Sequence, residues 1–239
     1  MRLDLTLVAL AFAALAASFA MMLGWIVVRF DWAVPFALLA GWYLADMASG
    51  LIHMYMDYRP CRAGVGLATL YFYEGPRDTP EYLALRDRIL ARVGPFERLV
   101  YDFKNHHPRP DALGRRSVMR LIGSTVIVAS LPFSIAVNGA NFLWPVPGWA
   151  TALAAALLLG GTFAQYFHGS LHRETVDPPV RLLRRLGLLM TPQAHAMHHA
   201  TLRQDFATNT GWSNPVLNRV FGALLRRGVL REEGLEPSS

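Results

Sequence analysis

The sequence predicts an all-α integral membrane protein in which four transmembrane helices carry a histidine-rich helical cap. Three observations support this fold. Hydrophobic residues make up 53% of the 239 residues and charged residues only 17%, a balance outside that of soluble globular proteins. Four apolar stretches reach the roughly 20 residues that a helix needs to cross the hydrocarbon core. All eight histidines fall in four short groups, at the ends of these stretches or in the segments that follow them. The length suits a single domain, 1–239.

The four expected spans cover 5–28, 33–56, 118–137 and 148–167. The first follows Arg2 and resembles the start of a secretory signal, which is the alternative interpretation. Its apolar run, however, continues beyond the usual length of a signal-peptide core, so we favour a span.

Basic residues indicate how the spans are oriented. The links between spans one and two and between spans three and four are short and contain one arginine, Arg29, whereas most other basic residues lie in 58–117 and 173–239. The positive-inside rule therefore places these two segments and both termini in the cytoplasm. We expect a bacterial inner membrane, with anionic lipid headgroups as partners. Nucleic acid is not expected, because the basic residues lie between apolar runs.

The cytoplasmic segments are expected to contain helices. Apolar residues recur at helical spacing from Tyr82 to Val100, after Thr79 as an N-cap, which predicts an amphipathic helix over 79–100. The segments 181–190 and 215–225 mix apolar residues and arginines in the same way. Such helices either lie in the membrane interface or pack as a small cytosolic cap. The polar tail 231–239 is expected to be disordered.

The histidines are spaced as metal ligands. They are His53 in span two, the doublet His106 and His107, the pair His168 and His172 leaving span four, and His195, His198 and His199 in the tail. On a helix, spacings of three and four residues place side chains on one face. Pro108 biases His107 toward an extended backbone, in which neighbouring side chains point apart, so the doublet is expected to serve two metals.

The available ligands limit the kind of metal. A single cysteine, Cys61, excludes a disulfide framework and a multi-thiolate site, which leaves imidazole and carboxylate. Eight imidazoles exceed the roughly four to six ligands of one transition metal, so two metals are indicated. Zinc has no redox chemistry and cannot support oxidation of an unactivated C–H bond by O₂, so iron is the metal that fits a membrane enzyme of this kind.

Two acids accompany the first histidine. Asp46, His53 and Asp57 lie on one stripe of span two, and an acid inside a membrane span is a functional candidate. One interpretation makes Asp46 or Asp57 an outer partner that orients a ligating imidazole. In the other, Asp46 hydrogen-bonds a neighbouring span and Asp57 contacts water.

Four motifs occur in a fixed order along the chain. They are an acid, Ser-Gly, a histidine and an acid in 45–57; the doublet within 103–110; a glutamine with two histidines in 165–172; and His-Ala-Met-His-His at 195–199 followed by Thr-Asn-Thr-Gly-Trp-Ser-Asn at 208–214. This set resembles the plasmanylethanolamine desaturase-like (CarF) family of membrane lipid desaturases, which also includes the plastid desaturase of phosphatidylglycerol palmitate.

The resemblance implies an O₂-dependent enzyme with two iron ions held by the eight histidines. It also implies a membrane phospholipid substrate and an external electron donor, either a ferredoxin or a cytochrome b5-like protein. The bond oxidised would lie near the headgroup, giving a vinyl ether (plasmalogen) or an unsaturated acyl chain. Met54 and Pro60 stand where members usually have Trp and Gly, so the substrate stays open.

Three other functions compete with lipid desaturation. A histidine-bound di-iron centre can also hydroxylate a lipid. A non-enzymatic haem-binding membrane cytochrome needs histidine pairs that face each other across spans, which does not explain clusters in loops. A zinc-dependent hydrolase is disfavoured because the chain has no His-Glu-x-x-His motif.

Overall fold

The computed structural model describes residues 5–238, and this part of the chain is helical without any strand. Its elements, in chain order, are α1 (Leu5–Val28), α2 (Val34–Tyr58), α3 (Leu67–Tyr71), α4 (Pro80–Leu90), α5 (Pro95–His106), α6 (Pro110–Gly114), α7 (Val118–Thr125), the π-helix η1 (Val126–Ser130), α8 (Leu131–Leu143), α9 (Gly148–Leu171), α10 (Pro178–Arg185), α11 (Pro192–Thr201), α12 (Asn214–Arg226) and the 3₁₀ turn η2 (Glu232–Gly234).

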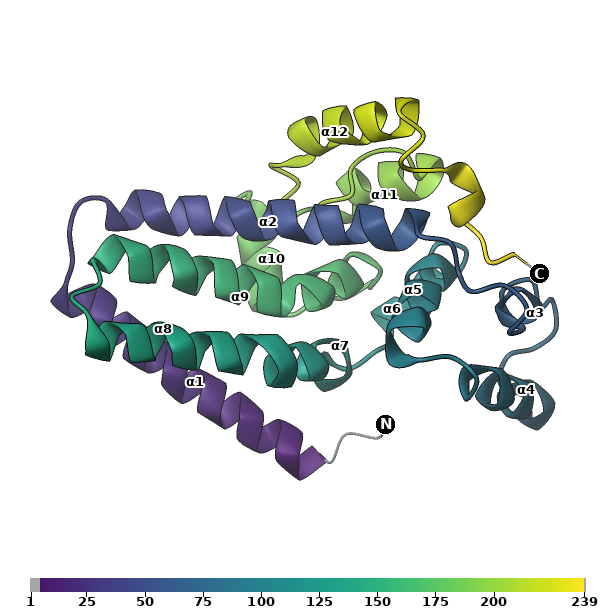
Figure 1. Cartoon of the computed structure of the whole chain (residues 1–239), viewed down its shortest axis with the longest axis horizontal. Coiled ribbons are helices and arrows are strands. Elements are labelled where there is room, and N and C mark those ends of the chain that lie inside the picture. The colour runs from purple at the N-terminus through teal and green to yellow at the C-terminus, as the bar shows by residue number, and fades with distance from the viewer. Residues whose placement is uncertain (1–4, 239) are drawn as a thin grey trace.

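Four helices are long and apolar enough to cross a membrane, as the sequence predicted. They are Thr6–Val28, Val34–Tyr58, Val118–Leu143, which joins α7, η1 and α8, and Gly148–Leu171. They form a bundle with both short links at one end, the hairpin end (Figure 1). Large apolar side chains such as Val27 and Phe36, each 74% exposed, cover its outer surface. Such a surface suits contact with lipid chains.

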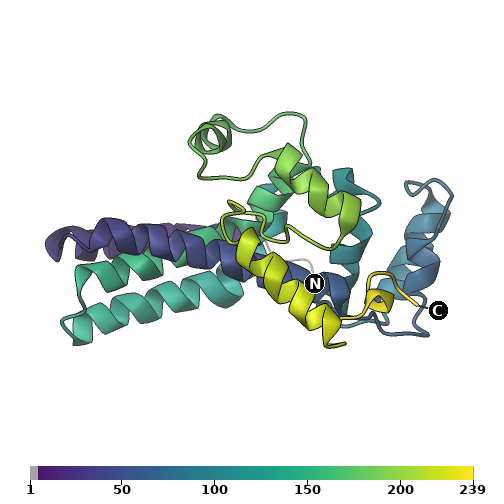
Figure 2. The ribbon, with the colours of Figure 1, turned by 90° about the horizontal axis from the view of Figure 1, so that it is seen from above.

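The remaining helices form the cap, defined here as α3–α6 together with α10–η2. Figures 1 and 2 show α3 and α4 beyond the end of the bundle opposite the hairpin end, α5 at the end of α2, and α11 and α12 beside α2. Tyr58 and Phe206 pack with Leu217 and Phe221 of α12, which fastens that helix to the end of span two. The cap therefore encloses the ends of the spans that carry histidines.

Spans three and four are both longer than predicted. In span three, polar residues near the end are satisfied inside the bundle. Asn138 donates hydrogen bonds to the Ser18 carbonyl (3.0 Å) and hydroxyl (2.8 Å). Asn141 accepts one from Arg29, 3.0 Å away, and Arg29 also donates to the Val146 carbonyl. The helix therefore continues through residues expected to form a link. Arg29, the one basic residue of the two links, thus connects the link between spans one and two to the end of span three and the link that follows it.

Span three contains a local change of helix type. The π-helix η1 ends two residues before Pro132, which has no N–H and cannot complete the α-helical pattern. One π turn accommodates this defect while the span continues as α8, and such turns are frequent at functional sites.

Spans two and four approach most closely, because glycine removes side-chain volume at two contact points. A Cβ on Gly41 would lie 2.3 Å from the Leu153 carbonyl oxygen, and one on Gly160 would lie 2.5 Å from the Ala45 Cβ. Small residues commonly bring membrane helices together in this way. This packing sets His53 of α2 beside His168 of α9, whose ring centroids are 4.8 Å apart.

The single helix expected over 79–100 is wrong: the segment forms α4 and the start of α5, separated at Gly94 and Pro95. Proline disfavours a helical residue before it, and Gly94 is extended (φ −69°, ψ 167°). The apolar periodicity arose because Tyr82, Ile89 and Val100 share one core. This core packs α4 and α5 together within the cap; whether these helices also lie in the membrane interface stays a prediction.

Two further expectations for the cap have different outcomes. The helix expected at 215–225 is α12, whereas the segment 181–190 is helical only to Arg185, where α10 ends. The tail is not wholly without structure, since it contains η2, and Gly234 packs so tightly that a Cβ there would lie 2.0 Å from the Tyr58 carbonyl oxygen. Residues 1–4, which include Arg2 and the expected cytoplasmic N-terminus, and residue 239 lie outside the described part.

We predict that the cap faces the cytoplasm. Cysteines replacing Arg92 or Arg227, both exposed, should react with a membrane-impermeant maleimide only from the cytoplasmic side. A cysteine at Trp32, 85% exposed at the hairpin end, should react only from outside. The native Cys61 is buried. Replacing it by serine in the background protein should therefore remove little labelling. Labelling of a cysteine at position 92 from outside would show that the predicted orientation is wrong.

Candidate metal centre

The eight histidines, spread over 147 positions of sequence, converge at the cap end of the bundle. They come from α2, α5, α9 and α11 or the residues that end these helices. Their potential ligand atoms form two sets, each with all atoms within 4.8 Å of one another. We call these the five-histidine group (His106, His168, His172, His195 and His199) and the aspartate group (His53, Asp57, His107 and His198).

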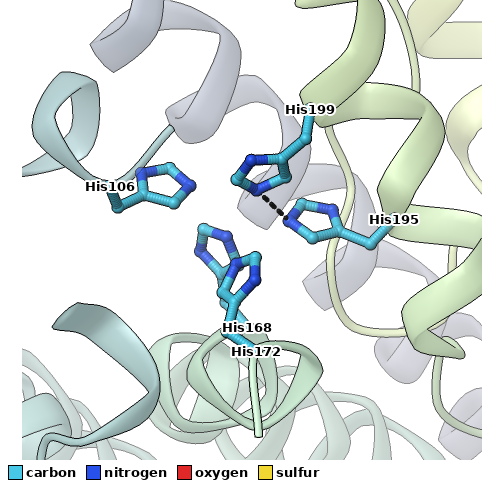
Figure 3. A group of neighbouring side chains, drawn as sticks. All are labelled: His106, His168, His172, His195 and His199. Carbon is cyan, nitrogen blue, oxygen red and sulfur yellow. Dashed lines mark hydrogen bonds between the residues drawn. The ribbon is translucent and has the colours of Figure 1, made fainter. Parts of the chain in front are cut away.

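In the five-histidine group, rings from three helices point into one space. Figure 3 shows His106 approaching from one side, His168 and His172 from the end of α9, and the other two from α11. The Nε2 atoms of His195 and His199 are 3.1 Å apart. The i, i+4 spacing of each helical pair is what allows both of its rings to face this space.

The aspartate group is built around a fully buried carboxylate. Asp57 Oδ2 lies 3.4 Å from His53 Nε2 and 3.4 Å from His198 Nε2, and Asp57 Oδ1 lies 3.5 Å from His107 Nε2. The sequence suggested that Asp57 orients an imidazole from behind. Its oxygens face the Nε2 atoms, on the side where a metal would lie, which also makes it a candidate direct ligand.

The histidine doublet is divided between the two groups, as expected, but not through an extended backbone. His107 is helical (φ −60°, ψ −54°) and ends α5. Successive residues on a helix point in directions about 100° apart, so His106 enters the five-histidine group and His107 the aspartate group. On α11, His198 is separated from His195 and His199 in the same way.

Backbone carbonyls orient three of the imidazoles. The Nδ1 atom of His53 donates to the Phe206 carbonyl at 2.9 Å, and that of His198 donates to the Gln204 carbonyl at 2.8 Å. His106 donates from Nδ1 to the Phe103 carbonyl. A proton on Nδ1 leaves the Nε2 lone pair free, as is usual for histidines that ligate metals.

Buried polar atoms without partners show that both groups suit a cation. Among the described residues, the Nε2 atoms of His53, His106, His168 and His172 and both Asp57 oxygens are buried and accept no hydrogen bond. Unpaired buried polar atoms are costly. Coordination to metal ions would satisfy them, and imidazole with carboxylate suits iron.

Burial favours the neutral form of five histidines that lie outside the spans. Burial, reinforced by neighbouring histidines, lowers the pKa of His106, His107 and His195 below the usual imidazole value. Burial and the same neighbours lower the pKa of His172 and of His199 to about 4. Neutral imidazoles are the form that binds metal.

Lys104 belongs to the surroundings of this centre and was missed by the sequence analysis. It is fully buried, and its ammonium donates to the Met56 carbonyl at 3.0 Å and to the Asp57 carbonyl. These carbonyls belong to the last turn of α2, where a cation is favourable. Burial lowers the pKa of Lys104 to about 8. Its position two residues before His106 was the only signal in the sequence.

Asp46 lies in the same helix as Asp57 but has different contacts. Its carboxylate accepts hydrogen bonds from the backbone N–H groups of Thr210 (2.7 Å), Gly211 (3.0 Å) and Ser213 (2.9 Å), and from the Ser213 hydroxyl (2.7 Å). It is fully buried and belongs to neither metal group. Asp46 therefore anchors the loop after α11 to span two. That loop also supplies Phe206, whose carbonyl orients His53.

We predict that Asp46→Ala destabilises the fold strongly. It leaves four donors unpaired, of which the two on Ser213 are buried, and each buried unpaired donor costs about 1–3 kcal/mol. The melting temperature of the purified protein in detergent should fall far more than in Asp31→Ala, which removes an acid that accepts one exposed hydrogen bond, from the Ala33 N–H. Equal melting temperatures for the two variants would show that the anchor contributes nothing.

Comparison with known proteins places the chain among desaturases. A family model described as a lipid desaturase domain matches residues 93–239, more than half of the chain. The chain is 26% identical over 211 residues to "Fatty acid desaturase 4, chloroplastic" of Arabidopsis thaliana, an alignment covering 84% of this chain and 54% of that protein. It is 23% identical over 210 residues to "Plasmanylethanolamine desaturase" of Myxococcus xanthus, covering 86% of this chain and 64% of that protein. The alignments thus span less than two thirds of either relative. No solved structure gives a significant match.

Proposed function

Because the chain belongs to the lipid desaturase family, we propose that it desaturates a chain of a membrane phospholipid at a di-iron centre. The observation that carries the proposal is the convergence of eight histidines into two adjacent groups at one end of a membrane bundle. The overall reaction removes two hydrogens from neighbouring carbons and forms a double bond. The two hydrogens removed from the lipid, two electrons and two protons together reduce one O₂ to two waters.

The five-histidine group and the aspartate group would each hold one iron, with Asp57 as a direct ligand. Bound iron would supply the oxidising chemistry with O₂ that a C–H bond of a lipid chain requires. The chain contributes neutral imidazoles oriented by backbone carbonyls and a buried site that limits access of water. The two electrons would come from an external donor, a ferredoxin or a cytochrome b5-like protein.

The position of the centre supports a reaction near the lipid headgroup. His53 lies in the last turns of span two, and His168 lies in the last turn of span four. The ends of spans meet the headgroup region. The candidate products are a vinyl ether from a plasmanyl lipid and a desaturated acyl chain, as the names of the two relatives suggest. We place the cap against anionic headgroups on the cytoplasmic side of a bacterial inner membrane.

The test is a comparison of lipid composition in cells that do and do not express the full chain. We expect new phospholipid species two hydrogens lighter than their precursors, and none in cells expressing His107→Ala. Species heavier by one oxygen would instead identify a hydroxylase. The purified protein should carry about two irons per chain; a Soret band from stoichiometric haem would support the cytochrome, and zinc without iron would exclude oxidation.

A further inference from the structure

A cavity reaches both metal groups from within the bundle. It has a volume of about 240 Å³ and is bounded by α2, α5, α7 and α9. Its lining includes His53 of the aspartate group and His168 of the five-histidine group. A molecule in this cavity would therefore contact both groups at once. We call it the central cavity.

An apolar groove continues from the central cavity along the membrane-spanning part. The groove, about 570 Å³, lies between α9 and the segment formed by η1 and α8. It shares Thr125 and Gly161 with the central cavity. Gly161 is exposed, and a Cβ there would meet no atom within 4 Å. The π-helix lines the opposite wall with Ala129 and Ser130. The groove suits a hydrocarbon chain.

A polar cavity continues in the other direction. It is about 180 Å³ in volume, shares Ser124, Gln165 and His168 with the central cavity, and is also lined by Arg116 and Arg120. Arg116 pairs with Asp102 at 3.2 Å, and both side chains are about one third exposed (35% and 32%). The Arg120 guanidinium has no hydrogen bond or ion pair with any described residue. Arginine in the interface is the side chain best suited to a phosphate.

We propose that these three spaces form the binding path of one phospholipid molecule, a proposal that rests on the proposed function. The phosphate lies at Arg116 and Arg120, the reacting carbons lie beside His53 and His168, and the rest of the chain lies in the groove over Gly161. This order places the new double bond within a short distance of the headgroup. A larger cavity of about 770 Å³ between α1, α2 and α9 touches none of the eight histidines, so it is not part of this path.

The test measures lipid retention by the purified full chain, using native mass spectrometry with two probes. They are dipalmitoyl phosphatidylglycerol and dipalmitoylglycerol, which lacks the phosphate. Gly161→Leu should lower retention of both lipids about tenfold, a loss of about 1.4 kcal/mol. Gly139→Leu is the matched control, because Gly139 of α8 also has open space around its Cβ position; it should retain both lipids normally. Arg120→Gln should lower phosphatidylglycerol retention about fivefold and leave dipalmitoylglycerol unchanged.

Ala129→Phe fills the same groove from the opposite wall, so the test does not depend on one variant that folds poorly. Equal retention by Gly161→Leu, Ala129→Phe and Gly139→Leu would overturn the path. An equal effect of Arg120→Gln on both lipids would overturn the phosphate site. If retention follows the expected pattern but the wild type forms no desaturated lipid, the proposed function fails and the lipid path stands. If the wild type desaturates lipid but none of these variants changes lipid retention, the lipid path fails and the proposed function stands.

Discussion

His172→Ala and His107→Ala should each leave no measurable desaturated lipid, although the two residues lie in different groups and 65 positions apart in the chain. Each replacement removes one ligand from a pair of metals that acts as a unit, so distance along the sequence should not matter. His53→Ala and His198→Ala should behave in the same way. Product formation is measured in membranes and normalised to folded protein, together with the iron content of the purified protein, which should fall from about two per chain.

Gln193→Ala is the control for these variants, because Gln193 is an exposed polar residue on the same helix as His195 and His199. It should keep normal turnover and normal iron. If the histidines were only buried polar residues, their loss would alter stability by amounts that follow burial, and several variants would remain active. Two or more single histidine variants with near-normal turnover would therefore refute a shared centre.

Asp57→Asn should reduce desaturation as severely as the loss of a histidine. The carboxylate lies 3.4–3.5 Å from three Nε2 atoms, so it is placed to bind metal directly, and a neutral amide removes the only negative charge of either group. Losing an outer partner of a ligand typically costs about 10–100-fold. A larger loss, accompanied by loss of iron, is expected here. Turnover and iron content are the measurements.

Asp87→Asn provides the comparison for Asp57→Asn, since Asp87 is an acid of α4 that is 70% exposed. It should leave turnover unchanged. An Asp57→Asn protein that retains its full iron content and loses activity only 10–100-fold would restore the role first suggested by the sequence, in which Asp57 orients an imidazole.

Local properties of the sequence were sufficient to predict the membrane helices. Hydropathy and length identify a span without knowledge of its neighbours, and all four expected spans are present. Their ends were less predictable, because the polar Asn138 lies inside span three, where its side chain donates to Ser18 of another span. The break at Gly94 and Pro95 was readable from the sequence, but the apolar periodicity on both sides of it concealed two helices that share one core.

The sequence by itself also determined the candidate ligand types: eight histidines in four groups, with one cysteine in the chain. It could not determine which histidines share a metal, because residues of one group are up to 145 positions apart and only the packing of α2, α5, α9 and α11 brings them together. Only the tertiary structure shows that two buried acids on one helix have different surroundings. Asp46 accepts hydrogen bonds from the loop after α11, whereas Asp57 faces three imidazoles. The chemistry of a carboxylate is the same at both positions, and the groups that surround it, brought from distant parts of the chain, decide its role.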